Sequence, residues 1–375
     1  MMKRVLFNFV TANTGGVIDF KRSVARALNE VASEFSCELY ISYSADDFGD
    51  LSKFEKIKFI SLPYIPKKAV DKIKFYERDL ERILRSNDID VVVNFGDIPA
   101  RTRSFQIFYF DWPYAVYNDW SLWSKMRLND LLSKSLKRIY FSITRNRPNR
   151  FIAQTQTMKR RLSQYVPEPK IEVIDVGFNA SERDVNQEAD FSSSGRDFIY
   201  PTAIYPHKNI YILADAAARL KKHSVVCTFV LTFDGTEGRE EGNFVSLVNE
   251  RRLEDYFEFT GRLSRIDLVR RMQQARAIIM PTLIETYGLP YLEAQVLKKA
   301  MLTSDRDFAR ELCGEAAVYF DPLDPEDVAQ AVRRVIEDPV LKERLEEASA
   351  RNLEARIEWS DTVRLILEQT EVPRR

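Results

Sequence analysis

Short apolar runs alternate with helix-length segments throughout the first half of the chain. Several runs, such as residues 91–95, are apolar at nearly every position. This pattern is typical of strands buried on both faces of a parallel sheet. Residues 17–33 and 69–86 have the length and periodicity of helices. The predicted strands of this half are residues 4–10, 37–43, 57–62, 91–95, 106–110, 151–154 and 171–175.

The same alternation starts again after a polar stretch at residues 181–196. Two successive strand–helix series predict an α/β protein with two tandem doubly wound, Rossmann-like domains. Such sheets bind ligands at the carboxyl ends of their strands, so we expect the domains to face a central cleft that holds the site. The predicted strands are residues 198–203, 225–232, 257–260, 277–281, 301–303 and 318–320, and the predicted helices are 209–222, 266–274, 289–298, 325–337 and a pattern from 339.

Length and composition agree with two packed domains. A chain of 375 residues is longer than one hydrophobic core usually organises. We place an N-terminal domain at 1–178, a C-terminal domain at 179–355 and a final helical segment at 356–375. No apolar run is long enough for a membrane span, and the first residues are interpreted as a strand, not a signal peptide. With three scattered cysteines and two histidines, we expect a cytoplasmic protein without a cysteine–histidine metal site.

The two halves differ in charge although the net charge is zero. Residues 1–180 carry 29 Lys and Arg against 21 Asp and Glu, so the second half is correspondingly acidic. A basic first half predicts an anionic partner there, such as a phospholipid surface or a phosphorylated acceptor. Overall neutrality disfavours nucleic-acid binding, so we expect no nucleic-acid partner.

The strongest candidate site is the loop and helix start at residues 281–294. A buried strand is followed by Glu285, and Gly288-Leu-Pro290 then opens a helix that contains Glu293. Proline suits a first helical turn, and the unpaired N–H groups of a helix start bind diphosphate well. Carboxylates beside a helix start that binds diphosphate indicate a ligand that also offers hydroxyls. The alternative is that Glu293 only serves the helix dipole and that Glu285 is a solvated loop residue.

The E-x7-E spacing of Glu285 and Glu293 around Tyr-Gly-Leu-Pro resembles the signature of the family-four retaining glycosyltransferases. The resemblance implies a GT-B fold and a nucleoside-diphosphate sugar as donor. It implies that Glu285 contacts the sugar hydroxyls and Glu293 the ribose. The amides of Tyr287, Gly288 and Leu289 would meet the diphosphate. The segment around Glu358-Trp359-Ser360 resembles the part that crosses back to the first domain.

A second motif, Pro206-His207-Lys208-Asn209, follows the first strand of the second domain. A lysine in a strand-to-helix loop can neutralise charge on a leaving diphosphate. The family usually has an upstream arginine as well, and Pro201 and Thr202 stand there in this chain. Lys208 is therefore a candidate catalytic residue and His207 a positioning or stacking residue. The alternative is an ordinary exposed lysine.

The first domain offers weaker candidates. Gly15 and Gly16 follow the first strand and can bring backbone amides close to the donor, or can simply form a tight turn. Asp111 ends an apolar strand and is our candidate near the reacting sugar, with a loop-capping role as the alternative. Asp97 is a weaker candidate of the same kind. In the second domain, Arg262 resembles a family residue near the phosphates.

For the mechanism, the resemblance implies same-face attack by the acceptor, with the leaving diphosphate helping to take its proton. The resemblance also implies that neither a metal nor another cofactor is needed. The alternatives are a GT-B-fold nucleotide-sugar epimerase or phosphorylase, and a non-catalytic nucleotide-sugar-binding subunit. The sequence does not choose between GDP- and UDP-linked hexoses.

The acceptor prediction rests on residues 124–150. This segment has eight basic residues against Asp130 alone, and its apolar residues recur at helical spacing. A basic amphipathic helix can lie on an anionic membrane. We therefore expect a lipid-linked glycan acceptor in cell-surface polysaccharide synthesis, with the protein peripheral on the inner face of the membrane. The alternative is that the apolar stripe packs into the first domain and the bases are solvated.

Overall fold

The computed structural model describes residues 2–12, 17–44, 48–66, 68–96, 98–124, 126–179, 195–236 and 238–371. The chain divides into two compact units, which are described one at a time. The first unit comprises Met1–Asn118, Arg127–Gly177 and Ile357–Arg375. The second comprises Asp119–Met126 and Phe178–Arg356.

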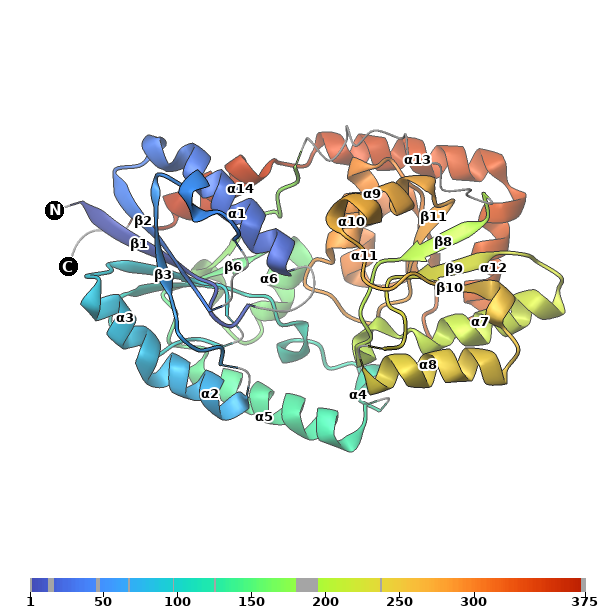
Figure 1. Ribbon diagram of the computed structural model, residues 1–375, viewed down its shortest axis with the longest axis horizontal. Helices are drawn as coiled ribbons and strands as arrows, with labels where there is room; N and C mark the ends of the chain where they lie inside the picture. The colour runs from blue at the N-terminus through green and yellow to red at the C-terminus, as the bar shows by residue number, and fades with distance from the viewer. Residues whose placement is uncertain are drawn as a thin grey trace. The chain divides into compact units, whose positions relative to one another are not determined.

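The first unit is built on a sheet of seven parallel strands in the order β3-β2-β1-β4-β5-β6-β7 (Figure 1). The order reverses between β1 and β4, which are both central. Residues 5–8 of β1 and all of β4 are buried, because both faces of the sheet are covered. The strands are β1 (Lys3–Asn8), β2 (Cys37–Tyr43), β3 (Ile57–Ser61), β4 (Val91–Asn94), β5 (Phe105–Tyr109), β6 (Arg150–Ala153) and β7 (Ile171–Val173).

Alternate side chains of the first sheet pack against different helices. Leu6 and Val92 belong to a buried cluster with Tyr76, which lies between α2 and α3. The opposite face meets α1, where Phe20 packs edge-on against Phe95. The helices of this unit are α1 (Val17–Val31), α2 (Ala69–Lys74), α3 (Leu80–Ser86), α5 (Leu128–Thr144), α6 (Gln156–Leu162) and α14 (Trp359–Glu368), and a π-helical turn (Phe75–Asp79) joins α2 to α3.

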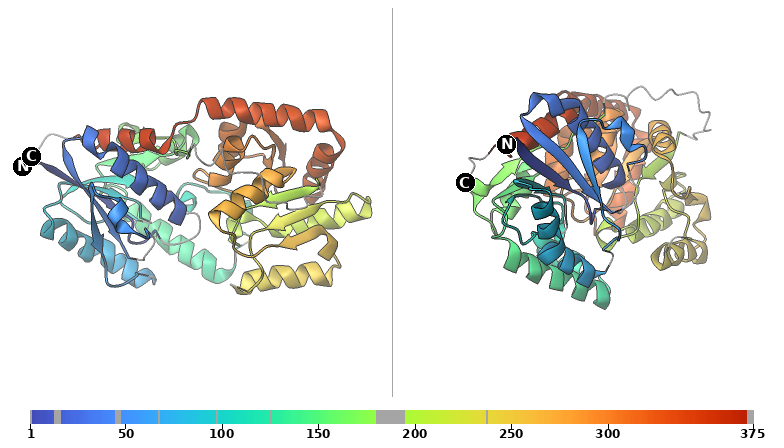
Figure 2. Two further views of the ribbon diagram at one scale, coloured as in Figure 1. Left: turned by 45° about the horizontal axis from the view of Figure 1, so that its top comes forward. Right: turned by 60° about the vertical axis from the view of Figure 1, so that its left-hand side comes forward.

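Helix α14 comes late in the chain but packs on the first unit beside α1 (Figure 2). The Trp359 ring lies edge-on to Phe20, with the ring centroids 5.1 Å apart. At Gly177 the backbone passes so close that a Cβ atom would lie 2.5 Å from the backbone nitrogen of Trp359. Glycine is therefore required at residue 177, where a side chain would push α14 away.

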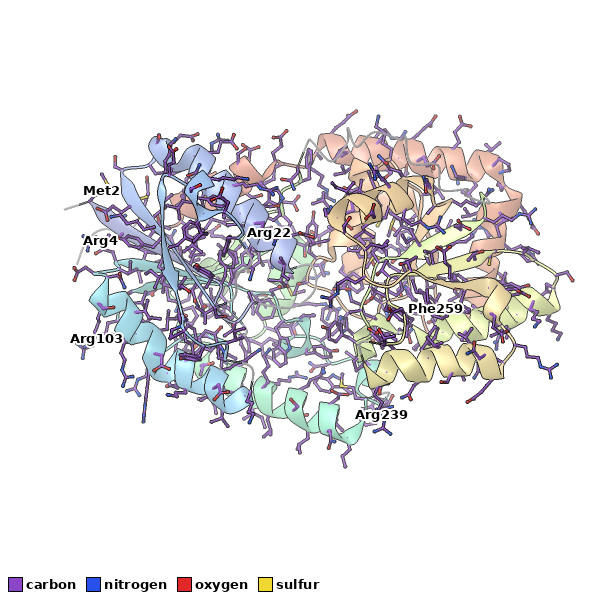
Figure 3. The ribbon with its side chains drawn as sticks, in the orientation of Figure 1. Met2, Arg4, Arg22, Arg103, Arg239 and Phe259 are labelled. Carbon is purple, nitrogen blue, oxygen red and sulfur yellow. The ribbon has the colours of Figure 1, made fainter. Side chains whose placement is uncertain are left out.

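The second unit repeats the architecture with six parallel strands in the order β10-β9-β8-β11-β12-β13. The order reverses between β8 and β11. Phe259, labelled in Figure 3, packs against Phe233 and Phe244 between this sheet and α8. The strands are β8 (Asp197–Tyr200), β9 (Thr228–Leu231), β10 (Phe257–Phe259), β11 (Ala277–Met280), β12 (Met301–Ser304) and β13 (Ala317–Phe320).

The helices of the second unit include one from the first half of the chain. This helix, α4 (Trp120–Trp123), is capped by Asp119, whose carboxylate pairs with Arg306 at 3.0 Å. The others are α7 (Tyr211–Lys222), α8 (Arg239–Glu250), α9 (Arg265–Gln274), α10 (Leu289–Val296), α11 (Asp307–Cys313), α12 (Pro325–Glu337) and α13 (Pro339–Glu354).

The observed strand orders confirm the prediction of two doubly wound, Rossmann-like α/β domains. Most predicted strands begin and end within one or two residues of the observed ones, and the strand at 37–43 has the predicted bounds. Within the described residues, no helix is long and apolar enough to span a membrane.

Candidate functional site

The loops that follow β8 and β11 lie side by side at the point where the second sheet reverses its strand order. Open α/β sheets bind their ligands at this point, next to the carboxyl ends of the strands. The loop after β8 contains Lys208, in a short 3₁₀ turn, Pro206–Lys208. The loop after β11 contains Glu285 and leads into α10. The fold thus brings the two sequence motifs of this unit together.

Lys208 and Glu285 form a largely buried ion pair. Lys208 Nζ lies 2.6 Å from Glu285 Oε1, and the side chains are 16% and 10% exposed. Thr282 Oγ1 donates a 3.1 Å hydrogen bond to the same carboxylate oxygen. A carboxylate this deeply buried needs a cation and donors to offset its lost hydration. The alternatives of a solvated Glu285 and an ordinary exposed Lys208 are therefore wrong.

The backbone of His207 joins the two loops. Its carbonyl accepts a hydrogen bond from Leu283 N at 2.8 Å and lies 3.1 Å from Thr282 Oγ1. The imidazole stacks on Tyr205, with ring centroids 5.8 Å apart and planes 13° from parallel. This geometry gives His207 the predicted kind of contact, a stack, but its role toward a ligand stays a prediction.

Asn209 is a positioning residue that the sequence motif did not reveal. Its backbone is left-handed, with φ of 52°, a conformation in which asparagine is enriched. Asn209 Nδ2 donates to the carbonyls of Pro281, at 3.1 Å, and Pro322, at 2.7 Å. Helix α7 consequently begins at Tyr211 and not at residue 209. The side chain fixes the Lys208 loop to two other loops of the same unit.

Tyr200, the last residue of β8, also holds the Lys208 loop in place. Its hydroxyl donates a 3.0 Å hydrogen bond to the Lys208 carbonyl. Burial, together with the nearby negative charge of Glu285, raises the pKa of Tyr200 well above its usual value. The phenol therefore keeps its proton and remains a donor at physiological pH.

Gly288 makes the turn that starts α10. Its φ is +83°, and a Cβ atom at this residue would lie 2.9 Å from Cδ2 of Tyr291. The Tyr291 ring cannot move aside, because it is fully buried and its hydroxyl is 2.7 Å from Thr303 Oγ1. Tyr287, before the turn, is also buried. Pro290 has no N–H, and the Tyr291 amide donates to the Gly288 carbonyl at 3.0 Å, so the Leu289 amide is the one at this helix start that suits an anion.

Glu293, inside α10, pairs with Arg265 at the start of α9. The side chains are 12% and 27% exposed, so this pair is also withdrawn from solvent. Arg262, the predicted arginine of this region, is exposed in the loop before α9. Sequence reasoning missed Arg265, because nothing in its local pattern distinguishes it from other arginines near helix starts.

In the first unit, the matching point of sheet reversal, between β1 and β4, holds a hollow of about 110 Å³. Asp111 and Lys72 line it together with the aromatic rings of Phe20, Phe95 and Tyr109. Burial, with the charge of Asp111 adding to it, raises the pKa of Tyr109, so its phenol stays neutral. Carboxylate, ammonium and aromatic faces together suit a sugar-like ligand.

Beneath this hollow, neutral amide side chains tie the strand ends together. Asn8 Nδ2 donates to Asn94 Oδ1 at 2.8 Å, and Ser42 Oγ donates to Asn8 Oδ1 at 2.9 Å. Gln106 exchanges two hydrogen bonds with the backbone of Ala100, at 2.8 and 3.0 Å. These groups are buried and satisfy one another, so they stiffen this edge of the sheet.

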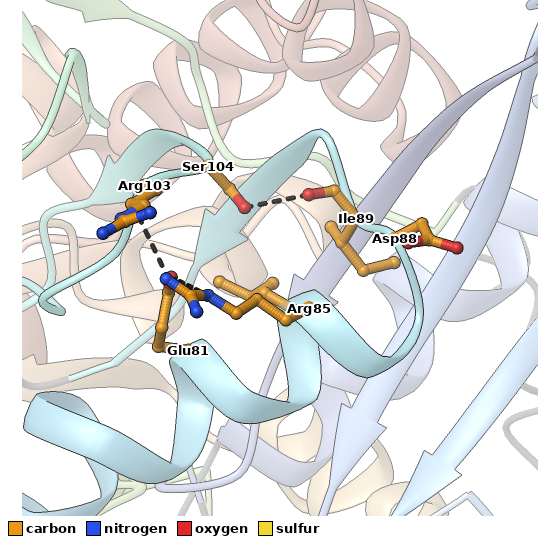
Figure 4. A pocket seen from close by; sticks show the side chains of 7 residues that line it. Glu81, Arg85, Asp88, Ile89, Arg103 and Ser104 are labelled. Carbon is orange, nitrogen blue, oxygen red and sulfur yellow. Dashed lines mark hydrogen bonds and ion pairs between the residues drawn. The ribbon is translucent and has the colours of Figure 1, made fainter.

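A second hollow in the first unit, of about 260 Å³, lies near the amino ends of β4 and β5 (Figure 4). Its polar groups bind each other: Arg85 Nε donates to Glu81 at 2.8 Å, and Ser104 Oγ donates to the Ile89 carbonyl. This is the edge opposite to the one at which doubly wound sheets bind ligands. We therefore assign the hollow no role in the site.

Three predicted residues cannot be placed. Gly15, Gly16 and Asp97 lie outside the described residues. Their predicted parts in donor binding or catalysis stay predictions, as do the roles of the placed residues toward a ligand.

Comparison with known proteins matches most of the second unit to one family model. The family model described as "Glycosyl transferases group 1" matches residues 182–352. The alpha-D-kanosaminyltransferase of Streptomyces kanamyceticus is 25% identical over 154 residues, which are 40% of this chain and 39% of that protein. The serotype-specific mannosyltransferase WbdA of Escherichia coli is 30% identical over 110 residues, 29% of this chain and 13% of WbdA. The match therefore spans well under half the length of these relatives.

A solved structure matches over nearly the whole chain. Anabaena HepE, determined in complex with UDP and glucose, superposes with a TM-score of 0.70 at 14% identity, covering 99% of both chains. At this identity the likeness shows the fold alone, and it confirms the predicted GT-B fold. The family model and the named relatives are glycosyltransferases, the class of enzyme that the sequence predicted for this chain.

Proposed function

We propose that the chain is a retaining glycosyltransferase that moves a hexosyl group from a GDP- or UDP-linked sugar to a glycan acceptor. The observation that carries this proposal is the buried Lys208–Glu285 pair beside the Gly288 helix start. It sets a cation, a carboxylate and the backbone amide of Leu289 around one loop junction. A donor that combines a diphosphate with sugar hydroxyls needs these three kinds of group.

Each group has a task in this proposal. The Lys208 ammonium carries three protons, and only one is needed for Glu285, so the others can stabilise charge on the departing diphosphate. The Leu289 amide at the start of α10 binds the same group. Glu285 orients the sugar, and Glu293 receives the ribose hydroxyls. Arg265 holds the Glu293 carboxylate and offers the second positive charge that the Lys208 loop lacks.

We propose that neither metal nor cofactor takes part, since Lys208 and Arg265 supply positive charge for the diphosphate. We also propose that the donor is UDP-linked, supported by the UDP and glucose named for HepE. For the acceptor we propose a lipid-linked glycan of polysaccharide synthesis, at the cytoplasmic face of the membrane. Support comes from the relative WbdA, a serotype-specific mannosyltransferase, and from helix α5.

The test is a thermal-shift panel of nucleoside diphosphates and their sugars, with wild type beside Glu293→Ala, followed by a transfer assay. We expect one nucleotide to stabilise the wild type, and expect the variant to lose most of this shift. The anomeric configuration of the product, read by NMR, checks retention, and EDTA should leave the rate unchanged.

Other results would contradict the proposal. Binding without turnover would indicate a non-catalytic nucleotide-sugar-binding subunit. Conversion of the free donor into its epimer would indicate an epimerase. If no nucleotide shifts the melting temperature of the wild type, the donor site itself is wrong.

A further inference from the structure

Helix α5 turns its apolar side away from the protein. Of its 17 residues, Phe141 and Thr144 are buried. Large aliphatic side chains recur every three or four residues and form one outward stripe about 22 Å long. The exposed fractions are 77% for Leu128, 58% for Leu132, 59% for Leu136, 57% for Ile139 and 71% for Ile143. The alternative in which this stripe packs into the first domain is wrong for these five residues.

The polar side of the helix faces the protein instead. Lys137 Nζ lies 4.3 Å from the centre of the Trp112 ring, and Lys134 Nζ lies 5.0 Å from that of Tyr114. The Tyr140 hydroxyl donates to Glu77, in the turn between α2 and α3. Cation–π contacts and hydrogen bonds therefore hold α5 in place. A helix on a globular surface normally packs its apolar stripe inward, so this orientation needs an external partner.

The charge around the stripe decides which partner fits. From residue 127 to 147 the chain has six basic residues and one acid, Asp130. Of the six, Lys134 and Lys137 contact aromatic rings of the protein and Arg147 pairs with Glu77, and the net charge of the segment is still strongly positive. A second copy of the chain docked on this stripe would bring like charges together, which opposes association. An anionic phospholipid surface offers apolar chains to the stripe and negative headgroups to the cations. The opposite side of the helix is polar, so α5 suits the membrane interface and not a span.

We infer that α5 lies in the surface of an anionic bilayer, with the stripe Leu128–Ile143 embedded among the lipid chains. This inference deepens the proposed lipid-linked acceptor, because it brings the first unit to the place where such an acceptor is anchored. It does not depend on the donor site, which lies in the other unit.

The test is co-sedimentation of the full chain with vesicles of phosphatidylcholine, with and without phosphatidylglycerol. The variant Leu132→Gln/Leu136→Gln/Ile139→Gln removes the middle of the stripe and keeps helix-forming residues. We expect wild type to bind the anionic vesicles and the variant to bind at least about tenfold more weakly. Val340→Gln, on α13 of the second unit, is the matched control, because Val340 is 74% exposed. It should bind like wild type.

Two outcomes would overturn the inference. One is equal vesicle binding, or none, for wild type and the triple variant. The other is a wild-type dimer that the triple variant dissociates, measured by sedimentation velocity, because the stripe would then serve a second copy. The nucleotide thermal shift of the triple variant separates the two proposals: it should match wild type, and its loss in both proteins would count against the donor site alone.

Discussion

The two units share their strand order over six strands, but they hold the loops at their points of sheet reversal by different means. In the second unit the loops are tied by a buried ion pair, Lys208–Glu285, supported by Thr282 and Asn209. In the first unit the equivalent edge is tied by neutral amides, with Asn8 bonded to Asn94. Amides can satisfy each other fully and are suited to stiffening. A buried charge pair keeps groups that can respond to a charged ligand.

The largest expected effect is on the rate of sugar transfer and comes from the Lys208–Glu285 pair of the second unit. Lys208→Ala should lower the transfer rate by about 10²–10³-fold, because the diphosphate then departs without its cation. Glu285→Ala should lower it similarly, since it leaves Lys208 buried and unpaired and the sugar unoriented. Steady-state kinetics with the best donor from the thermal-shift panel measures both. Lys222→Ala, an exposed lysine at the end of α7, is the control and should keep the wild-type rate. A small effect at Lys208 would contradict the difference drawn between the units.

The turn at Gly288 comes next. Gly288→Ala meets a left-handed backbone and the buried Tyr291 ring, so we expect a loss of about 2–4 kcal/mol in the unfolding free energy of the second unit. Urea denaturation measures the loss, and nucleotide binding should weaken with it. Gly238→Ala is the control, because the space around that Cβ is open and the residue's φ is extended. Unchanged stability in Gly288→Ala would show that the turn tolerates side chains.

The next effect concerns the amide side chains that tie the strand ends of the first unit together. Replacing one of them should lower stability somewhat less than Gly288→Ala does and should leave donor affinity unchanged. Asn94→Leu keeps the side-chain volume but leaves Asn8 Nδ2 without its acceptor, at a cost of about 1–3 kcal/mol. Chemical denaturation reports the loss, and the nucleotide thermal shift should stay as in wild type. Asn146→Leu, at an exposed residue of the same unit, should be neutral. Loss of nucleotide binding in Asn94→Leu would mean that the amide-tied sheet edge of the first unit also affects the donor site of the second unit.

The smallest effect is a pH dependence in the second unit. Burial lowers the pKa of Lys299 to about 8 from 10.5. Between about pH 8 and 10.5 the unfolded chain holds a proton that the folded chain has released, so Lys299 makes stability rise with pH. The free-energy cost of burying the charged Lys299 side chain is fully present at pH 7. Lys299→Met should therefore stabilise the protein by about 1 kcal/mol at pH 7, after the lost bond to the Gln273 carbonyl is allowed for, and the gain should disappear near pH 10.5. A gain that is equal at both pH values would exclude this cause.

The sequence predicted most of the fold because its signals are local. Continuous apolar runs such as Val91–Asn94 predict strands buried on both faces, and the order of strands and helices then implies two doubly wound sheets. The junction of Lys208 with Glu285 could also be anticipated, because both follow strands whose carboxyl ends meet at one edge.

The remaining parts of the site depend on pairs that are distant in sequence. Asn209 contacts carbonyls of residues 281 and 322, and Arg265 pairs with Glu293 across 28 residues. No local pattern identifies such partners. Helix α5 shows a further limit: its periodicity predicts a stripe, but the side that faces the protein is set by Trp112, Tyr114 and Glu77, whose positions only the folded structure gives.

The packing of α14 on α1 has a consequence for the order in which the protein matures. Trp359, Val363 and Ile366 are buried in the first unit, yet the ribosome makes them after the whole second unit. During synthesis the first sheet therefore lacks α14 beside α1 until the end, while the second unit can already fold. Apolar surface at α1 is exposed to chaperones for that interval, and the N-terminal unit, although first to emerge, is the last to be finished.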